Sequence, residues 1–131
     1  MSKTVYSAIR TPDGTVLHSS HVHDYVHHID ANGETYVLDG GLAYTRTSVN
    51  NIPAENISLT TDDPHEEIRK VIKWGSYGRG GKGPLNKIPV KDMSNEHIVA
   101  VTKLPYTHPN ILIVLHNELD YREERNIFIP N

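Results

Sequence analysis

The chain has 131 residues, a formal net charge of −3 at pH 7 and 37% hydrophobic residues, which suffices for one ordinary domain with its own core. The slight acidic excess argues against a general nucleic-acid or membrane binder, because such proteins usually carry many basic residues. There is no cysteine, so disulfides and thiolate metal sites are excluded and a reducing, cytoplasmic setting is expected. We predict no signal peptide and no membrane-spanning segment, since no window approaches about eighteen apolar residues.

The first half of the chain has the pattern of short strands joined by turns. Strands at about residues 5–9 and 15–18 flank Thr11-Pro12-Asp13-Gly14, in which proline presets φ and glycine closes the turn. A second hairpin is predicted around Asn32-Gly33, because this pair tolerates the positive φ angles of a tight turn. Further strands at 43–48 and 56–60 complete an expected antiparallel sheet of five or six strands.

The central hairpin divides its side chains between two faces, because successive strand residues point to opposite sides. Asp39-Gly40-Gly41 ends this hairpin and predicts a bulge, a sharp bend or the close approach of another group. Tyr44 and Arg46 follow on one face of the next strand. One face of the first hairpin strand holds His23, Tyr25, His27 and Ile29, and the other holds Asp24, Val26, His28 and Asp30.

The pattern changes to helical at residue 62. Asp63 is a candidate cap, Pro64 suits a first helical turn and Glu66 completes a capping box, so we expect a helix over about 64–74 that stops at Gly75. The order of strands and helices predicts an α+β fold in a single ligand-binding domain, 1–131, with a sheet part at 1–61 and a helical part at 62–131.

Two further helices are predicted in the second half. Ser94 caps a short one, and Pro109 opens a longer one that carries Ile111, Leu112, Leu115 and Leu119 on its apolar side. Its exposed side is expected to carry Glu118, Arg122 and Arg125. The apolar tail Ile127-Phe128-Ile129 is expected to dock on the sheet or on a neighbouring subunit, which predicts a homo-oligomer.

A glycine-rich, basic segment at 75–84 is expected to be a mobile loop. Its backbone N–H groups, with Arg79 and Lys82, suit a phosphate, while Trp74 and Tyr77 suit stacking on a base. It is not a P-loop, since glycine and proline follow Lys82 in place of a Ser or Thr and a helix. The alternatives are a solvated connector for the loop and a core position for Trp74.

Arginines and histidines supply the remaining candidates. Arg122 and Arg125 lie one helical turn apart and could clamp a phosphate, although intrahelical ion pairs with neighbouring glutamates are the alternative. Imidazole and carboxylate groups also suit zinc or manganese, so a metal-dependent phosphodiesterase or nuclease is the second function considered. Because the histidines fall on two faces without a closed ligand set, we expect no bound metal. The residues of this alternative are His21, His23, Asp24 and His28.

A run of motifs along nearly the whole chain resembles one family of small phage proteins. The run is His-x-His-Asp-Tyr, Asp-x-Asn-Gly, Asp-Gly-Gly-x-x-Tyr-x-Arg, Asp-Asp-Pro-His-x-x-Ile-Arg, Trp-Gly-x-Tyr-Gly-x-x-Gly-Lys-x-Pro-Leu and Glu-Leu-x-Tyr-Arg. It is similar to the first-described Thoeris anti-defence family, whose members bind and sequester cyclic ADP-ribose signals made by bacterial TIR-domain proteins without cleaving them. Thr45 and Thr47 flank Arg46 where that family has a more basic run.

The resemblance implies an N-terminal antiparallel sheet followed by helices, assembly from dimers, and a non-enzymatic sponge acting in the cytoplasm of the host cell. It also implies that a cyclic ADP-ribose isomer is the ligand, with no cofactor, and that a cyclic oligonucleotide is a further candidate. It supplies no residue-by-residue binding set, so the candidate ligand-binding residues rest on chemistry alone. They are His23, Tyr25, Arg46, Trp74, Tyr77, Arg79, Lys82, Arg122 and Arg125.

Overall fold

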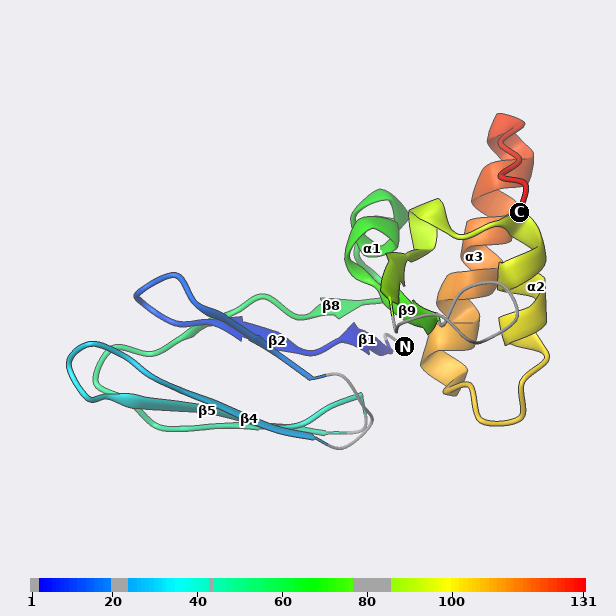
Figure 1. The fold of residues 1–131 in the computed structure, drawn as a ribbon. Helices are drawn as coiled ribbons and strands as arrows, with labels where there is room; N and C mark the ends of the chain where they lie inside the picture. Colours follow the sequence, from blue (N-terminus) through cyan, green and yellow to red (C-terminus); the bar gives the residue numbers. More distant parts are fainter. Residues whose placement is uncertain (1–2, 20–23, 43, 77–85) are drawn as a thin grey trace. The chain divides into compact units, whose positions relative to one another are not determined.

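The computed structural model describes residues 3–19, 24–42, 44–76 and 86–131. The chain forms two compact units, Met1–Asp62 and Asp63–Asn131. In the described residues the first unit is built from strands, and the second holds the helices together with one hairpin (Figure 1). The predicted α+β class is therefore confirmed, and the boundary between the units falls where the sequence pattern changes.

The strands of the first unit form three small antiparallel sheets, where the sequence predicted one larger sheet. The sheet orders are β1–β8, β3–β2–β7 and β4–β5–β6. Between the β1–β8 and β2–β7 pairs, the Ser58 hydroxyl accepts from Ala8 N–H at 3.0 Å and donates to Ala8 O at 3.2 Å, and this carbonyl also accepts from Ile57 N–H at 3.1 Å. The strands are β1 (Thr4–Tyr6), β2 (Ala8–Arg10), β3 (Val16–His18), β4 (Asp24–Ile29), β5 (Thr35–Gly40), β6 (Thr45–Thr47), β7 (Glu55–Asn56) and β8 (Leu59–Thr60).

Both predicted turns of the first unit are present. Gly14, at φ 92°, donates its N–H to Thr11 O at 2.9 Å and closes the β2–β3 turn. In the β4–β5 hairpin Gly33 has φ 80°, and the Asp30 carboxylate accepts the N–H groups of Asn32 and Glu34 at 2.9 Å. These turns fix the strand register, which brings together a core of Ile9, Leu17, Tyr36 and Leu38, with Val26 and Ala54 packed against it.

Gly40 shows the close approach that its sequence context predicted. It has φ 108°, and a Cβ built there would lie 2.1 Å from Tyr44 O. The next residue, Gly41, donates its N–H to the same carbonyl at 2.6 Å. The tight return from β5 to β6 therefore requires glycine at position 40 and sets where Tyr44 and β6 lie.

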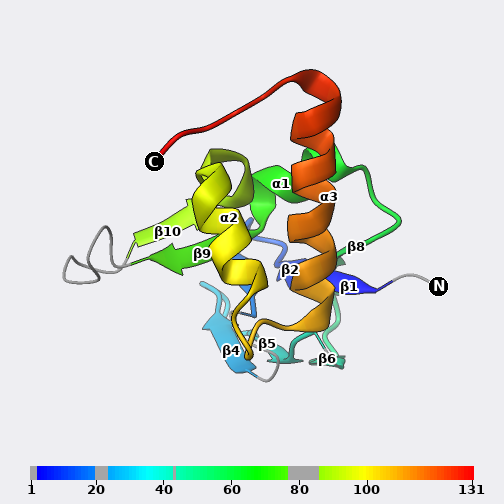
Figure 2. The same cartoon turned by 90° about the vertical axis from the view of Figure 1, so that its right-hand side faces the viewer.

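The second unit is a helical cluster with one hairpin. Figure 2 shows α2 and α3 side by side. Apolar side chains from each helix fill the core, namely Ile68, Ile72, Val90, Met93, Ile98, Val101, Val114 and Leu115. The elements are α1 (His65–Val71), β9 (Lys73–Ser76), β10 (Asn86–Pro89), the 3-10 helix η2 (Val90–Asp92), α2 (Asn95–Thr102) and α3 (Pro109–Arg125).

The helix predicted over 64–74 is shorter than expected. It begins after Pro64, which makes no side-chain cap hydrogen bond, and ends at Val71. Trp74 and Gly75 lie in β9, opposite Ile88 and Lys87 of β10. The prediction was wrong here because pairing with a distant strand overrides local helical spacing. The rest of the predicted glycine-rich loop, from residue 77, lies outside the described residues.

The starts of α2 and α3 are confirmed. The Ser94 hydroxyl accepts from His97 N–H at 3.1 Å, and α3 begins at Pro109, where His108 Nδ1 accepts from Asn110 N–H at 3.0 Å. After α3, Asn126 has φ 56° and turns the chain back. Ile129 then exchanges hydrogen bonds with Asn95, so the tail docks on the N-terminal end of α2.

In the described residues no helix has both the length and the apolar character needed to cross a bilayer.

Candidate functional site

The β4–β5–β6 sheet has one face directed into the core and one directed outward. On β5, Tyr36, Leu38 and Gly40 are buried, so strand alternation turns Thr35, Val37 and Asp39 to the other side. On β4 the exposed residues are Tyr25, His27 and Ile29, which share one face of the strand as the alternation predicted. We call the surface made by Tyr25, His27, Ile29, Val37, Asp39, Tyr44 and Arg46 the outer face.

Strand register aligns three polar groups across the outer face. Tyr25 pairs with Asp39, and Asp39 pairs with Arg46. Residues directly opposite in a sheet share a face, and two strand spacings separate Tyr25 from Arg46 by about 10 Å. Two of the residues selected from the sequence are therefore brought into one row, with a carboxylate between them.

Aromatic rings surround this row. The Arg46 guanidinium lies 5.6 Å from the centroid of the Tyr44 ring, and the Tyr25 and His27 rings are 6.1 Å apart. Tyr25 is 61% and Tyr44 39% exposed, so both rings are open to solvent. A cation held against a ring keeps its hydrogen-bond donors directed along its edge, where they can bind an anion.

The outer face combines the three kinds of contact that a nucleotide requires. Exposed tyrosine rings offer stacking surfaces for a base. Arg46 can donate charge-assisted hydrogen bonds to a phosphate. Asp39 can accept hydrogen bonds from ribose hydroxyls, and its negative charge would keep the phosphate on the Arg46 side of the row.

The opposite face of β4 engages the β2–β3 turn. His28 Nε2 lies 2.7 Å from Asp13 Oδ2 and 3.3 Å from Thr15 Oγ1. Hydrogen bonds from Thr11, His28 and Thr15 hold the pKa of Asp13 well below its usual range. Because one ring nitrogen contacts both partners, this cluster lacks the two-sided relay of a Thr-His-Asp catalytic triad.

The metal-dependent phosphodiesterase or nuclease considered from the sequence finds no set of metal ligands in the part of the chain that the structure describes. No group of three or more His, Asp or Glu side chains there is arranged to hold an ion. Of its four residues, His21 and His23 lie outside the described residues. Asp24 and His28 share the face of β4 opposite the outer face.

A buried ionic network in the second unit accounts for Arg122. Glu118 is fully buried and Arg122 is 1% exposed, so the prediction that these two residues of α3 face solvent was wrong, whereas Arg125 is exposed as predicted. Glu118 accepts two hydrogen bonds from Arg69, at 2.8 and 2.9 Å, and one from Arg122 at 2.7 Å. His65 Nε2 lies 2.9 Å from the same carboxylate.

The partners of Glu118 determine its ionisation. Burial alone would raise the pKa of this carboxyl, but the hydrogen bonds from Arg69, His65 and Arg122 outweigh burial and hold the pKa at about 2. The remaining donors of Arg122 bond Asn95 Oδ1 at 2.8 Å and Val90 O at 3.0 Å. Arg122 therefore joins α2, α3 and η2, and in this arrangement its donors are directed to protein groups.

The other candidates occupy separate places. Arg125 lies over the Tyr121 ring, 3.8 Å from its centroid, and contacts Glu124. Trp74 is partly buried on β9. His23, Tyr77, Arg79 and Lys82 lie outside the described residues.

Asp39 and His27 were not selected as site residues from the sequence. The missing information is the strand register. A two-residue turn at Asn32-Gly33 would place Gly40 opposite Tyr25, whereas the three-residue loop 31–33, closed by the hydrogen bond from Asp30 N–H to Glu34 O, places Asp39 there.

No protein-family model, curated protein or solved structure matches this chain.

Proposed function

We propose that this protein binds and sequesters a cyclic ADP-ribose-type signal without cleaving it, and that the outer face contributes to the binding site. The row of Tyr25, Asp39 and Arg46 carries the proposal, since it offers stacking, hydroxyl recognition and phosphate binding on one surface. The ligand class comes from the motif resemblance to the phage Thoeris inhibitors. The sheet-then-helix order of the fold agrees with that resemblance.

The required affinity indicates how large the site must be. To hold a signal at submicromolar concentration, the protein must supply roughly 8 to 10 kcal/mol. A stacked base contributes about 1–3 kcal/mol and a charge-assisted hydrogen bond about 1.5–3 kcal/mol. The outer face alone falls short of the requirement. The proposal therefore keeps Arg79 and Lys82, chosen from the sequence alone, as separate candidates for phosphate binding, and it takes a second copy of the chain in a homo-oligomer as the source of further contacts.

The direct test follows the fate of the ligand. The protein is incubated with a cyclic ADP-ribose isomer, denatured by heat, and the released small molecule is identified by mass spectrometry. Recovery of intact ligand supports sequestration. Conversion that a chelator abolishes would instead favour the metal-dependent phosphodiesterase, and failure to take up any nucleotide would favour a module that binds a host protein.

Calorimetric titration of matched variants tests the outer face. Arg46→Ala is expected to weaken binding about tenfold to a hundredfold, the equivalent of one charge-assisted hydrogen bond. Arg10→Ala is the control, because Arg10 is also an exposed strand arginine of the first unit but pairs with Glu55 at 3.3 Å. Equal affinities of the Arg46→Ala and Arg10→Ala variants would show that the outer face is not part of the binding site.

The same titration tests the glycine-rich segment. Arg79→Ala combined with Lys82→Ala is expected to weaken binding by about 2–4 kcal/mol. Lys87→Ala combined with Lys91→Ala controls for loss of positive charge, because both lysines lie in the second unit at described positions. If only the Arg46 variant loses affinity, the phosphate contacts belong to the outer face alone.

A further inference from the structure

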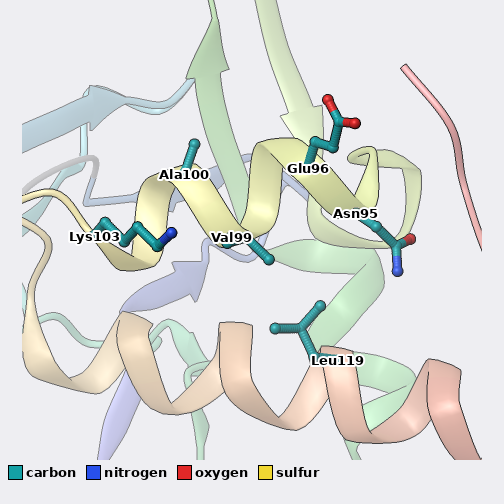
Figure 3. Close-up of a pocket in the computed structure, with 6 residues that line it drawn as sticks. All are labelled: Asn95, Glu96, Val99, Ala100, Lys103 and Leu119. Carbon is teal, nitrogen blue, oxygen red and sulfur yellow. The ribbon is translucent and has the colours of Figure 1, made fainter.

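A stripe of four residues follows one side of α2. Glu96, Val99, Ala100 and Lys103 are spaced so that they fall on one helix face. Together with Asn95 and Leu119 they line an open groove of about 430 Å³ between α2 and α3. Figure 3 shows Val99 of α2 and Leu119 of α3 pointing toward one another across this groove.

The stripe is separate from the part of α2 that stabilises the fold. Ile98 and Val101 are 0% and 2% exposed and fill the core of the second unit. Val99 is 37% exposed, and Ala100 is exposed. The stripe therefore has an apolar middle, an acidic end at Glu96 and a basic end at Lys103.

The order of charges along the stripe is self-complementary. The midpoint between Glu96 and Lys103 falls between Val99 and Ala100. A two-fold axis at that point would pair two α2 helices antiparallel, with Glu96 facing the partner's Lys103 about 5 Å to either side of the axis. A parallel pairing would instead place like charges together.

We propose that this groove holds α2 of a second copy of the chain in an antiparallel, two-fold contact. Ala100 lets the two backbones approach closely at the axis. Asn131 of the tail donates a hydrogen bond to the Glu96 carboxylate. One carboxylate accepts several hydrogen bonds, so Glu96 retains capacity for the partner's Lys103. The contact uses no residue of the outer face and is independent of the proposed ligand.

Size sets the strength of the contact. Eight helical residues span about 12 Å, which is small beside a standard interface of about 800 Å² per partner. The two copies should therefore associate weakly, with a dissociation constant of roughly tens to hundreds of micromolar through this contact.

Charge reversal tests the contact on the full chain without ligand. Sedimentation equilibrium from about 10 µM to about 1 mM covers the expected range. Glu96→Lys and Lys103→Glu each bring like charges together at both ends, and each is expected to weaken dimerisation about tenfold. The double variant restores opposite charges and should recover at least half of the lost association on a logarithmic scale. Glu123→Lys, an exposed position on α3, controls for the change in net charge.

Circular dichroism establishes that each variant keeps its helices, which is expected because all the positions are exposed. The proposal is overturned if the wild-type chain is monomeric at about 1 mM, or if the single reversals leave self-association unchanged. It is equally overturned if the double variant associates no better than either single variant. Ligand titration is unaffected by the weak contact, so the outcome is independent of the sequestration assay.

Discussion

The two units of this protein use arginine in opposite ways. In the second unit, Arg122 is buried and its donors are bonded to Glu118, Asn95 and Val90. In the first unit, Arg46 lies on an exposed strand beside Tyr44. A buried arginine whose donors bond protein groups has a structural role, whereas an exposed arginine against a ring can exchange water for a ligand. The environment of each arginine, more than its place in a motif, distinguishes a structural role from a binding role.

The substitution with the largest expected effect on stability removes the charge of Glu118. Glu118→Gln leaves Arg69 and Arg122 without their anion, and we expect it to destabilise the second unit by about 3–5 kcal/mol. Urea unfolding followed by the fluorescence of Trp74, the single tryptophan of the chain, reports on this unit. Glu123→Gln on the exposed side of α3 is the control and should change stability by less than about half a kcal/mol. Equal effects of the two substitutions would contradict the structural role of the network.

Acid should act on the same carboxylate. The pKa of Glu118 is about 2 in the fold, below the ordinary 4.5. Its contribution to stability is therefore complete above about pH 4.5 and is lost as pH falls toward 2. We expect the midpoint of urea unfolding of the wild-type protein, followed by Trp74 fluorescence, to fall over this interval. The midpoint of Glu118→Gln should fall less. Parallel pH profiles for the two proteins would show that other carboxylates dominate.

A third test concerns the turn that places Tyr44 on the outer face. Gly40→Ala would bring a Cβ within 2.1 Å of Tyr44 O at a φ of 108°, and should destabilise the first unit by about 2–3 kcal/mol. Gly33→Ala also has positive φ but meets no atom within 4 Å, so about 1 kcal/mol is expected. Far-ultraviolet circular dichroism during urea unfolding measures both losses. If Gly33→Ala costs as much as Gly40→Ala, the close approach is not the cause.

The smallest effect is expected at Arg125. Its guanidinium stacks on Tyr121, but the side chain is 43% exposed. Arg125→Ala should therefore cost less than about 1 kcal/mol of stability, as judged by Trp74 fluorescence. Titration of the same variant with a cyclic ADP-ribose isomer then determines whether Arg125 belongs to the binding site, since folding remains intact. A loss of several kcal/mol in stability would place Arg125 in the buried network with Arg122.

Local signals in the sequence predicted local structure well. Asn32-Gly33 gave the central hairpin, Ser94 and Pro109 gave the starts of α2 and α3, and the alternation of β4 gave its two faces. In each case the cause lies within a few residues of the effect, as a turn, a cap or a strand period. The order of strands and helices followed from these signals, and with it the fold class.

The failures came from partners that are distant in the sequence. Glu118 and Arg122 have the spacing of a solvent-exposed ion pair, but Arg69 and His65 from α1 and Asn95 from α2 supply the partners that offset their burial. Trp74 continues the helical spacing in the sequence, but in the structure it pairs with Ile88 of β10 in a strand. The row of Tyr25, Asp39 and Arg46 also depends on two registers at once, so composition alone selected two of its members and missed the third.

The return of the chain end has a practical consequence for handling the protein. Asn95 Oδ1 accepts hydrogen bonds from both Ile129 N–H and Arg122. A purification tag joined directly to Asn131 would disturb the hydrogen bond from Ile129 to Asn95. It would also crowd Glu96, which Asn131 contacts. Fusions that must report native behaviour are therefore better attached at the other end of the chain, or joined through a flexible spacer.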